Sequence, residues 1–278
     1  MVTSVDIVNY LRHSPIYIDT VGDIEIDRDS IVVGNTSVIA RCSIKGIEGD
    51  KSLKCYYRPC SRQQPSYGTS YIKEALLIPS ISGHAIYVDV AFAEWIEGET
   101  LTDILLDDDC NYKSLSRAFD TLAYTILTKG YTHSDISPDN IIVNGDKMYL
   151  IDIDALGKHH TEHRPSTEYS TPLFSHHHRI FSDYEHLDDY SIAAISVILA
   201  TLSTYRSRRS VPKLLIEFGY GNINNAIEFS KQRLLDKRDM IHYQMAMEMS
   251  NCFGQIPNLP LMLALILKRK RVLRQKNG

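Results

Sequence analysis

Residues 131–155 read YTHSDISPDNIIVNGDKMYLIDIDA, and the rest of the chain is organised around them. Two short apolar runs flank the turn Asn144-Gly145-Asp146, and an Asn-Gly pair between apolar runs predicts a β-hairpin. Asp135 and Asn140 precede the first strand of this hairpin, and Asp152 ends the second. Such a set of two carboxylates and an amide can hold a divalent cation through oxygen ligands and orient a hydroxyl group beside it.

This stretch resembles the catalytic loop and the metal-binding turn of the protein kinase superfamily, H-x-D-x-x-x-x-N followed by D-F-G. Here the first motif is His133-x-Asp135-x-x-x-x-Asn140 and the second is Asp152-Ile153-Asp154. The resemblance implies that Asp135 accepts or orients the proton of the substrate hydroxyl, and that Asn140 and Asp152 hold magnesium. It also implies that His133 packs beneath the loop. The alternative is a hairpin with incidental acidic residues in its loops.

The composition is that of an ordinary soluble globular protein, with 278 residues, 44% hydrophobic and 23% charged. This length suits one large or two modest domains. The net charge of −4 gives no whole-chain argument for nucleic acid binding. Five cysteines without a C-x-x-C motif predict reduced thiols in a cytoplasmic setting rather than a disulfide framework or a zinc ribbon. No apolar run reaches the roughly 18 residues that a membrane span needs.

The first hundred residues predict a small β-rich lobe. A short helix is expected at 3–14, and a second one at 70–78 carries Glu74. Between and after them, short β-branched or aromatic runs predict an antiparallel meander, with strands at 24–26, 31–33, 38–44, 53–57 and 85–92.

The same region contains the residues that the resemblance assigns to the nucleotide. Gly34 falls where a kinase has its Gly-rich loop, although the other glycines are missing and an ordinary hairpin turn is an equal alternative. Ser52-Leu53-Lys54 resembles the V-A-I-K strand, so that Lys54 and Ser52 would face the nucleotide. Glu74 would form the ion pair that positions Lys54 on the phosphates.

A connecting segment at 94–98 resembles the kinase hinge. The backbone groups of Glu94, Trp95 and Ile96 are expected to pair with adenine. The predicted domains are therefore an N-lobe at 1–93, the hinge, and a helical C-lobe at 99–278.

The sequence of the second half predicts helices at 114–129, at 188–202 and in several segments after Pro212. The first of these helices is expected to end at Gly130. Asp188-Asp189-Tyr190-Ser191 resembles the D-x-W-S-L-G start of the buried kinase helix. The resemblance implies that Asp188 accepts backbone hydrogen bonds from the catalytic loop.

Three residues depart from the family pattern inside the motif. Ser134 stands where arginine is common, Ser137 replaces the lysine typical of Ser/Thr kinases, and Asp154 replaces glycine. Thr171-Pro172-Leu173-Phe174 resembles the segment that docks a peptide substrate. Seven of the eleven histidines lie between His159 and His186. They predict a polar, pH-sensitive loop, with a metal site at His159, His160 and His163 as the alternative.

The resemblance covers residues 30–250 and implies an α+β, two-lobed protein kinase-like fold with ATP between the lobes. The implied protein is a divergent, eukaryotic-like Ser/Thr protein kinase that uses ATP and Mg²⁺ to phosphorylate a protein substrate. No nucleic acid partner and no membrane span are expected. Two alternatives stay open: a small-molecule phosphotransferase of the aminoglycoside or choline kinase type, and an ATP-binding pseudokinase scaffold.

Overall fold

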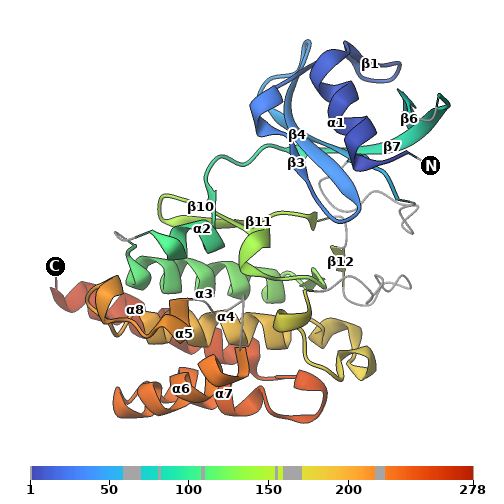
Figure 1. The fold of residues 1–278 in the computed structure, drawn as a ribbon. Coiled ribbons are helices and arrows are strands. Elements are labelled where there is room, and N and C mark those ends of the chain that lie inside the picture. The colour runs from blue at the N-terminus through green and yellow to red at the C-terminus, as the bar shows by residue number, and fades with distance from the viewer. Residues whose placement is uncertain are drawn as a thin grey trace. The chain divides into compact units, whose positions relative to one another are not determined.

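A computed structural model of the chain describes residues 2–58, 70–80, 83–107, 110–153, 156–158, 171–216 and 223–277. The fold is mixed α+β, which confirms the α+β part of the fold class expected from the sequence (Figure 1). The chain divides into two compact units, Met1–Ile96 and Glu97–Gly278. This division falls inside the segment 94–98 that resembles a hinge. Among the described helices, none has the length and apolarity needed to cross a membrane.

In the described part of the first unit, seven antiparallel strands form one sheet in the order β1-β2-β4-β5-β7-β6, with β3 paired to β4. The strands are β1 Ile16–Ile18, β2 Gly22–Ile26, β3 Val32–Val33, β4 Ser37–Ile44, β5 Lys51–Tyr56, β6 Ser70–Pro79 and β7 Ala85–Glu94. Helix α1 (Ser4–His13) begins at a capping box between Thr3 and Asp6. Its buried residues Ile7 and Leu11 share one apolar core with Leu53 of the sheet. The meander and the first helix are therefore confirmed.

The helix expected at 70–78 is wrong, because this segment is strand β6. It pairs with β7 from Ser70↔Phe92 to Pro79↔Ala85, and the register shifts between Ile72 and Leu76. Glu74 lies in that bulge with φ 50°. A bulge interrupts the two-residue alternation that identifies a strand in sequence, so the apolar residues on its two sides match helical spacing instead.

The second unit is mainly helical (Figure 1). Its helices are α2 Leu101–Leu106, α3 Tyr112–Thr128, α4 Asp189–Leu202, α5 Lys213–Ile216, α6 Ile223–Asp236, α7 Met240–Glu248 and α8 Leu259–Asn277. Helix α4 is buried among α3, α6 and α7, and its side chains Ile192, Ile195 and Ile198 are fully buried. The central helix expected at 188–202 and the helix expected at 114–129 are thus confirmed.

The predicted hairpin is confirmed by strands β10 (Ile141–Asn144) and β11 (Lys147–Leu150), which pair antiparallel. Strand β8 (Glu99–Thr100) joins β10 on its other edge, and β9 (Tyr131–Thr132) pairs with β12 (Gly157–Lys158). Gly98 has φ 138°, and a Cβ atom there would lie 2.3 Å from the carbonyl oxygen of Val143. Only glycine permits so close an approach of the two backbones.

Short 3₁₀ helices connect these elements. They are η1 Arg28–Ser30, η2 Pro138–Asn140, η5 Pro172–Phe174, η6 Arg179–Phe181, η7 Tyr184–His186, η8 Arg208–Ser210 and η9 Cys252–Gly254.

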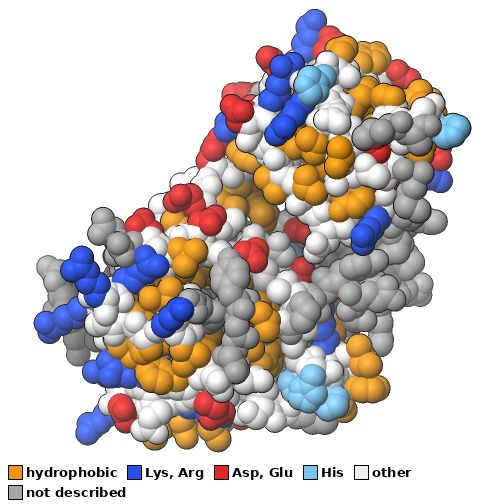
Figure 2. All heavy atoms as spheres, viewed as in Figure 1, with side chains coloured by type: hydrophobic (Ala, Val, Ile, Leu, Met, Phe, Trp, Pro, Cys, Tyr) orange, Lys and Arg blue, Asp and Glu red, His pale blue; other side chains and the backbone are white. Residues whose placement is uncertain are grey.

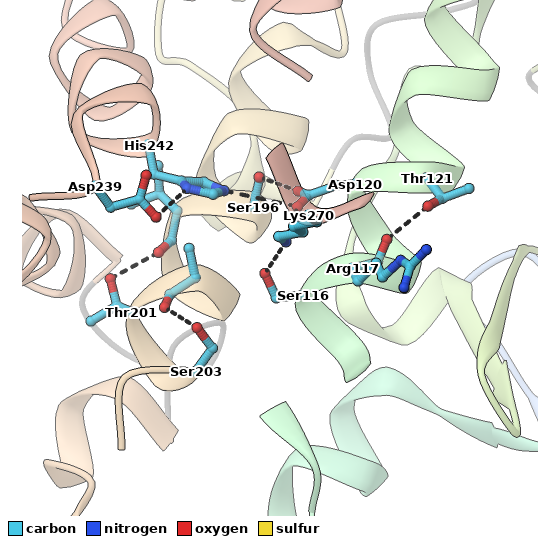
Figure 3. A network of polar contacts seen from close by, with 12 residues as sticks. Ser116, Arg117, Asp120, Thr121, Ser196, Thr201, Ser203, Asp239, His242 and Lys270 are labelled. Carbon is cyan, nitrogen blue, oxygen red and sulfur yellow. Dashed lines mark hydrogen bonds and ion pairs between the residues drawn. The ribbon is translucent and has the colours of Figure 1, made fainter. Parts of the chain in front are cut away.

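A buried polar network links four helices of the second unit (Figure 3). The fully buried Asp120 of α3 accepts hydrogen bonds from Ser196 of α4 at 2.6 Å and from Lys270 of α8 at 2.7 Å. His242 of α7 lies between Asp120, at 3.9 Å, and Asp239, at 2.8 Å. Burial alone would lower the pKa of His242, but the two carboxylates raise it to about 9. The network therefore contains charges of both signs inside the helical core.

Candidate active site

Asn140 and Asp152 lie at the same end of the β10–β11 hairpin. The ladder ends at the pair Ile141↔Leu150, and the amide of Ile151 then donates to the carbonyl of Asn140 at 2.9 Å. This additional bond places Asn140 opposite Ile151, so that Asp152 follows directly at the same edge. Asp152 has φ 56°, in the left-handed region that aspartate tolerates better than most residues, and its side chain is exposed.

The half-buried carboxylate of Asp135 is held on both of its oxygens. Oδ1 accepts from the backbone amide of Thr171 at 2.6 Å and from the Thr171 hydroxyl at 2.8 Å. Oδ2 lies 3.3 Å from the side-chain amide nitrogen of Asn140, which also donates to the Asp135 carbonyl at 2.9 Å. The two predicted site residues Asp135 and Asn140 are therefore in direct contact, and Oδ2 is the oxygen of Asp135 that a substrate hydroxyl could approach.

The loop that carries Asp135 is anchored to the start of α4. The fully buried carboxylate of Asp188 accepts from the backbone amide of His133 and, at 2.8 Å, from that of Ser134. This confirms the hydrogen bonds that the resemblance implied for Asp188. Burial raises the pKa of Asp188, and its interactions with His133 and Arg179 oppose the shift. The anchor fixes a backbone in which Ser134 has φ 72°.

The buried ring of His133 connects the loop of Asp135 with the turn before Asp152. Its Nδ1 accepts from the backbone amide of Asp135 at 3.3 Å, so Nε2 carries the hydrogen and donates to the carbonyl of Ile151 at 3.0 Å. Because both ring nitrogens are used in these backbone contacts, His133 has a structural role.

The sequence did not indicate Arg179, and it did not indicate that Thr171 reaches Asp135. Arg179 is buried, and its guanidinium donates to the carbonyl of Ser134. Burial lowers the pKa of Arg179, while Asp188 and Asp135 oppose the shift. Arg179 thus brings a cation to the loop of Ser134. Its separation of 45 residues from Ser134 left no local signal in the sequence.

Asn140 and Asp152 carry side-chain oxygens of the type that would hold a magnesium ion shared with phosphate groups. The nitrogen of the Asn140 amide faces Asp135, which leaves Oδ1 for a cation, and Asp152 adds carboxylate oxygens. Mg²⁺ is commonly held by one or two carboxylates together with phosphate oxygens. In the described part of the chain, no three residues of the His, Cys, Asp and Glu types converge as a complete metal site. Asp154 lies outside the described residues.

In the first unit, Lys54 and Ser52 lie on the face of β5 that points away from the apolar core, because Leu53 and Cys55 point into that core. The Lys54 ammonium lies 5.5 Å from the centre of the Tyr56 ring. The Ser52 hydroxyl is 3.5 Å from the carbonyl of Ala93 on β7. The expectation that Lys54 and Ser52 share one face is confirmed.

Two other residues that were expected to contribute to nucleotide binding do not lie as the resemblance to protein kinases implied. Glu74 lies on β6 rather than on a helix, its side chain is exposed, and β7 separates its strand from that of Lys54. Gly34 belongs to the β3–β4 hairpin, where its amide donates to the carbonyl of Ser37 at 2.8 Å. This amide is used inside the turn, so it is not a free donor for a phosphate.

The segment expected to bind adenine also has internal contacts. Glu94 ends β7 and forms an ion pair with Lys51 at 2.5 Å. The amide of Trp95 donates to the carbonyl of Asp50 at 3.0 Å, so this expected adenine contact is already satisfied by the protein. Ile96 is the last residue of the first unit and is half-buried.

Two clusters of histidines lie in the segment 159–178 of the second unit. The predicted metal-site residues His159, His160 and His163 lie outside the described residues. The rings of His176, His177 and His178 lie close together in tilted orientations, with 4.3 Å between the ring centres of the first two. Figure 2 shows histidine side chains beside hydrophobic ones on this unit.

No family model and no curated protein matches the chain. The functional interpretation therefore depends on the geometry of the site.

Proposed function

We propose that the chain is an ATP- and Mg²⁺-dependent phosphotransferase with the two-lobed architecture of the protein kinases, acting on Ser or Thr hydroxyls of proteins. The observation that carries the proposal is the fixed carboxylate of Asp135. Thr171 holds its Oδ1, the amide of Asn140 lies beside its Oδ2, and Asp188 anchors the loop behind it. A carboxylate fixed in this way can accept the hydrogen bond of an attacking hydroxyl.

The other residues have roles that follow from their chemistry. Asn140 Oδ1 and the carboxylate of Asp152 would hold magnesium, which neutralises charge on the phosphates when bound. Lys54 would add its positive charge to the α- and β-phosphates. Phosphoryl transfer requires little covalent chemistry from the protein, so positioning by Asp135 and charge neutralisation are the main contributions.

The test measures Mg·ATP binding first and transfer from labelled ATP second, with protein mixtures and small alcohols as separate acceptors. Loss of a general base typically lowers the rate by about a hundredfold or more, so Asp135→Asn should lose transfer while still binding Mg·ATP. Asp146→Asn, in the exposed hairpin turn, is the matched control. Transfer by Asp135→Asn at the wild-type rate would refute the role of Asp135. Transfer to small alcohols and not to proteins would identify the chain as a small-molecule phosphotransferase.

A second candidate function is ATP binding without turnover. It is favoured by the amide of Gly34, which bonds to Ser37 inside its hairpin instead of being free for a phosphate. A Mg·ATP-dependent rise in the unfolding temperature without any transfer would support this candidate over the first.

A further inference from the structure

One face of the sheet in the first unit carries a chain of interacting side chains: Lys54, Tyr56, Tyr71 and Asp89. Lys54 is paired with Ala91 across β5 and β7, and Tyr71 is paired with the same Ala91 across β6 and β7. Paired residues of antiparallel strands point to the same face, and so do residues two apart on one strand. Asp89 is two residues from Ala91, so it lies on the face of Lys54, away from the apolar core.

The contacts along this face are continuous. The ammonium of Lys54 lies 5.5 Å from the centre of the Tyr56 ring, and the Tyr56 and Tyr71 rings are 6.1 Å apart. The hydroxyl of Tyr71 donates to Asp89 Oδ2. The backbone amide of Glu74 donates to Asp89 Oδ1 at 2.8 Å. Both oxygens of the carboxylate are therefore oriented by β6.

The register also places Asp89 within reach of Lys54. The pair Cys55↔Val90 puts Tyr56 opposite Asp89, so Lys54 and Asp89 are diagonal neighbours on adjacent strands. Diagonal neighbours are about 7–8 Å apart, a distance that a long side chain such as lysine can span. Glu74, by contrast, lies on the more distant strand with its side chain exposed.

We propose that Asp89, and not Glu74, is the acidic residue that positions Lys54. The inference rests on the proposed function in one respect: Lys54 is taken to bind the phosphates of ATP. The bulge of β6 has a defined part in this arrangement, since it turns the amide of Glu74 toward Asp89 and fixes the carboxylate. Asp89 acts through Lys54 and is a positioning residue.

The first test does not need ATP. The amine of Lys54 is acetylated in the full-length protein, and the rate is followed by mass spectrometry in the wild type, in Asp89→Asn and in Glu74→Gln. Asparagine keeps the oxygen that accepts from Glu74, removes the charge, and replaces the oxygen that accepts from Tyr71 by an amide group, to which the Tyr71 hydroxyl can still bond as an acceptor. Removal of a nearby negative charge at a partly exposed site should speed acetylation of Lys54 by up to about fivefold, because the amine is then more often neutral. Glu74→Gln should match the wild type.

The second test measures the dissociation constant of Mg·ATP in a double-mutant cycle with Lys54→Met. Asp89→Asn should weaken binding by about three- to tenfold in the wild type and have no further effect once Lys54 is replaced. A purely structural role in the bulge would weaken binding equally in both backgrounds, and that result would overturn the proposal. Wild-type acetylation rates in Asp89→Asn, or faster acetylation in Glu74→Gln, would also overturn it. A wild type that binds no Mg·ATP refutes the proposed function, whereas the acetylation rates still decide whether Asp89 is the partner of Lys54.

Discussion

Replacement of His242 by glutamine should change how the stability of the helical unit depends on pH. The His242 ring is buried between Asp120 and Asp239, and these carboxylates raise its pKa from 6.5 to about 9. In the unfolded chain the ring returns to the ordinary value. The folded state therefore holds a proton between these two pH values that the unfolded state has lost.

The sign and size of the effect follow from this difference. The stabilisation is complete below pH 6.5 and is lost as pH rises through the folded pKa of about 9. At 1.36 kcal/mol per pKa unit, the shift corresponds to about 3 kcal/mol of unfolding free energy. His242→Gln removes the titrating ring. The wild type should therefore exceed the variant most at about pH 6, and the difference should close near pH 9.

The assay is urea unfolding of both proteins at several pH values across this range. His186→Gln is the control. Hydrogen bonding to Asp189 raises the pKa of His186 as well, but this ring does not belong to the network around Asp120. The difference between His242→Gln and the wild type must depend on pH with the predicted sign. A constant difference across the range would show that folding does not change the pKa of the ring, and a difference that grows with pH would show that folding lowers it; either result would refute the argument. An NMR titration of the ring measures the same pKa directly.

Three further substitutions have expected outcomes. Asp188→Asn replaces one of two backbone acceptors by a donor, so turnover should fall together with a loss of about 1–3 kcal/mol in unfolding free energy, measured by urea unfolding; unchanged turnover would contradict the anchoring role. Gly98→Ala should destabilise the protein by about 2 kcal/mol or more, measured by urea unfolding, because the new Cβ would meet the carbonyl of Val143, and a variant as stable as the wild type would refute the close approach. Lys270→Met should reduce the unfolding free energy by about 3 kcal/mol in the same assay, because the buried carboxylate of Asp120 then keeps only the more distant charge of His242; Asp120→Asn in that background should recover part of the loss.

The parts of the fold that could be predicted from the sequence are those fixed by local chemistry. The turn at Asn144-Gly145 defines the β10–β11 hairpin, and Gly145 has the positive φ of 60° that this turn requires. The apolar run after Asp188 predicts α4, because a helix that is apolar on all sides must be buried. The placement of Asn140 and Asp152 at one end of the hairpin follows from these local signals.

The parts that could not be predicted depend on contacts between distant segments. Residues 70–78 contain good helix formers, but pairing with β7 and the bulge at Glu74 override that propensity. The contact of Thr171 with Asp135 spans 36 residues, and that of Arg179 with Ser134 spans 45. Pairing across such distances leaves no periodicity in the sequence. The role proposed for Asp89 was not visible for the same reason, since it depends on the register of three strands.

The ion pair between Asp120 and Lys270 has a consequence for biosynthesis. The two residues are 150 positions apart in the chain. At a synthesis rate of about 5–20 residues per second, about 8–30 s pass between the synthesis of Asp120 and that of Lys270. Until Lys270 is made, the charge of His242, at 3.9 Å, is the partner available to Asp120, so the helices around this carboxylate cannot close around a fully paired group. The helical unit should therefore reach its native packing only late in translation, and nascent chains that end before Lys270 should be the ones that chaperones and proteases recognise.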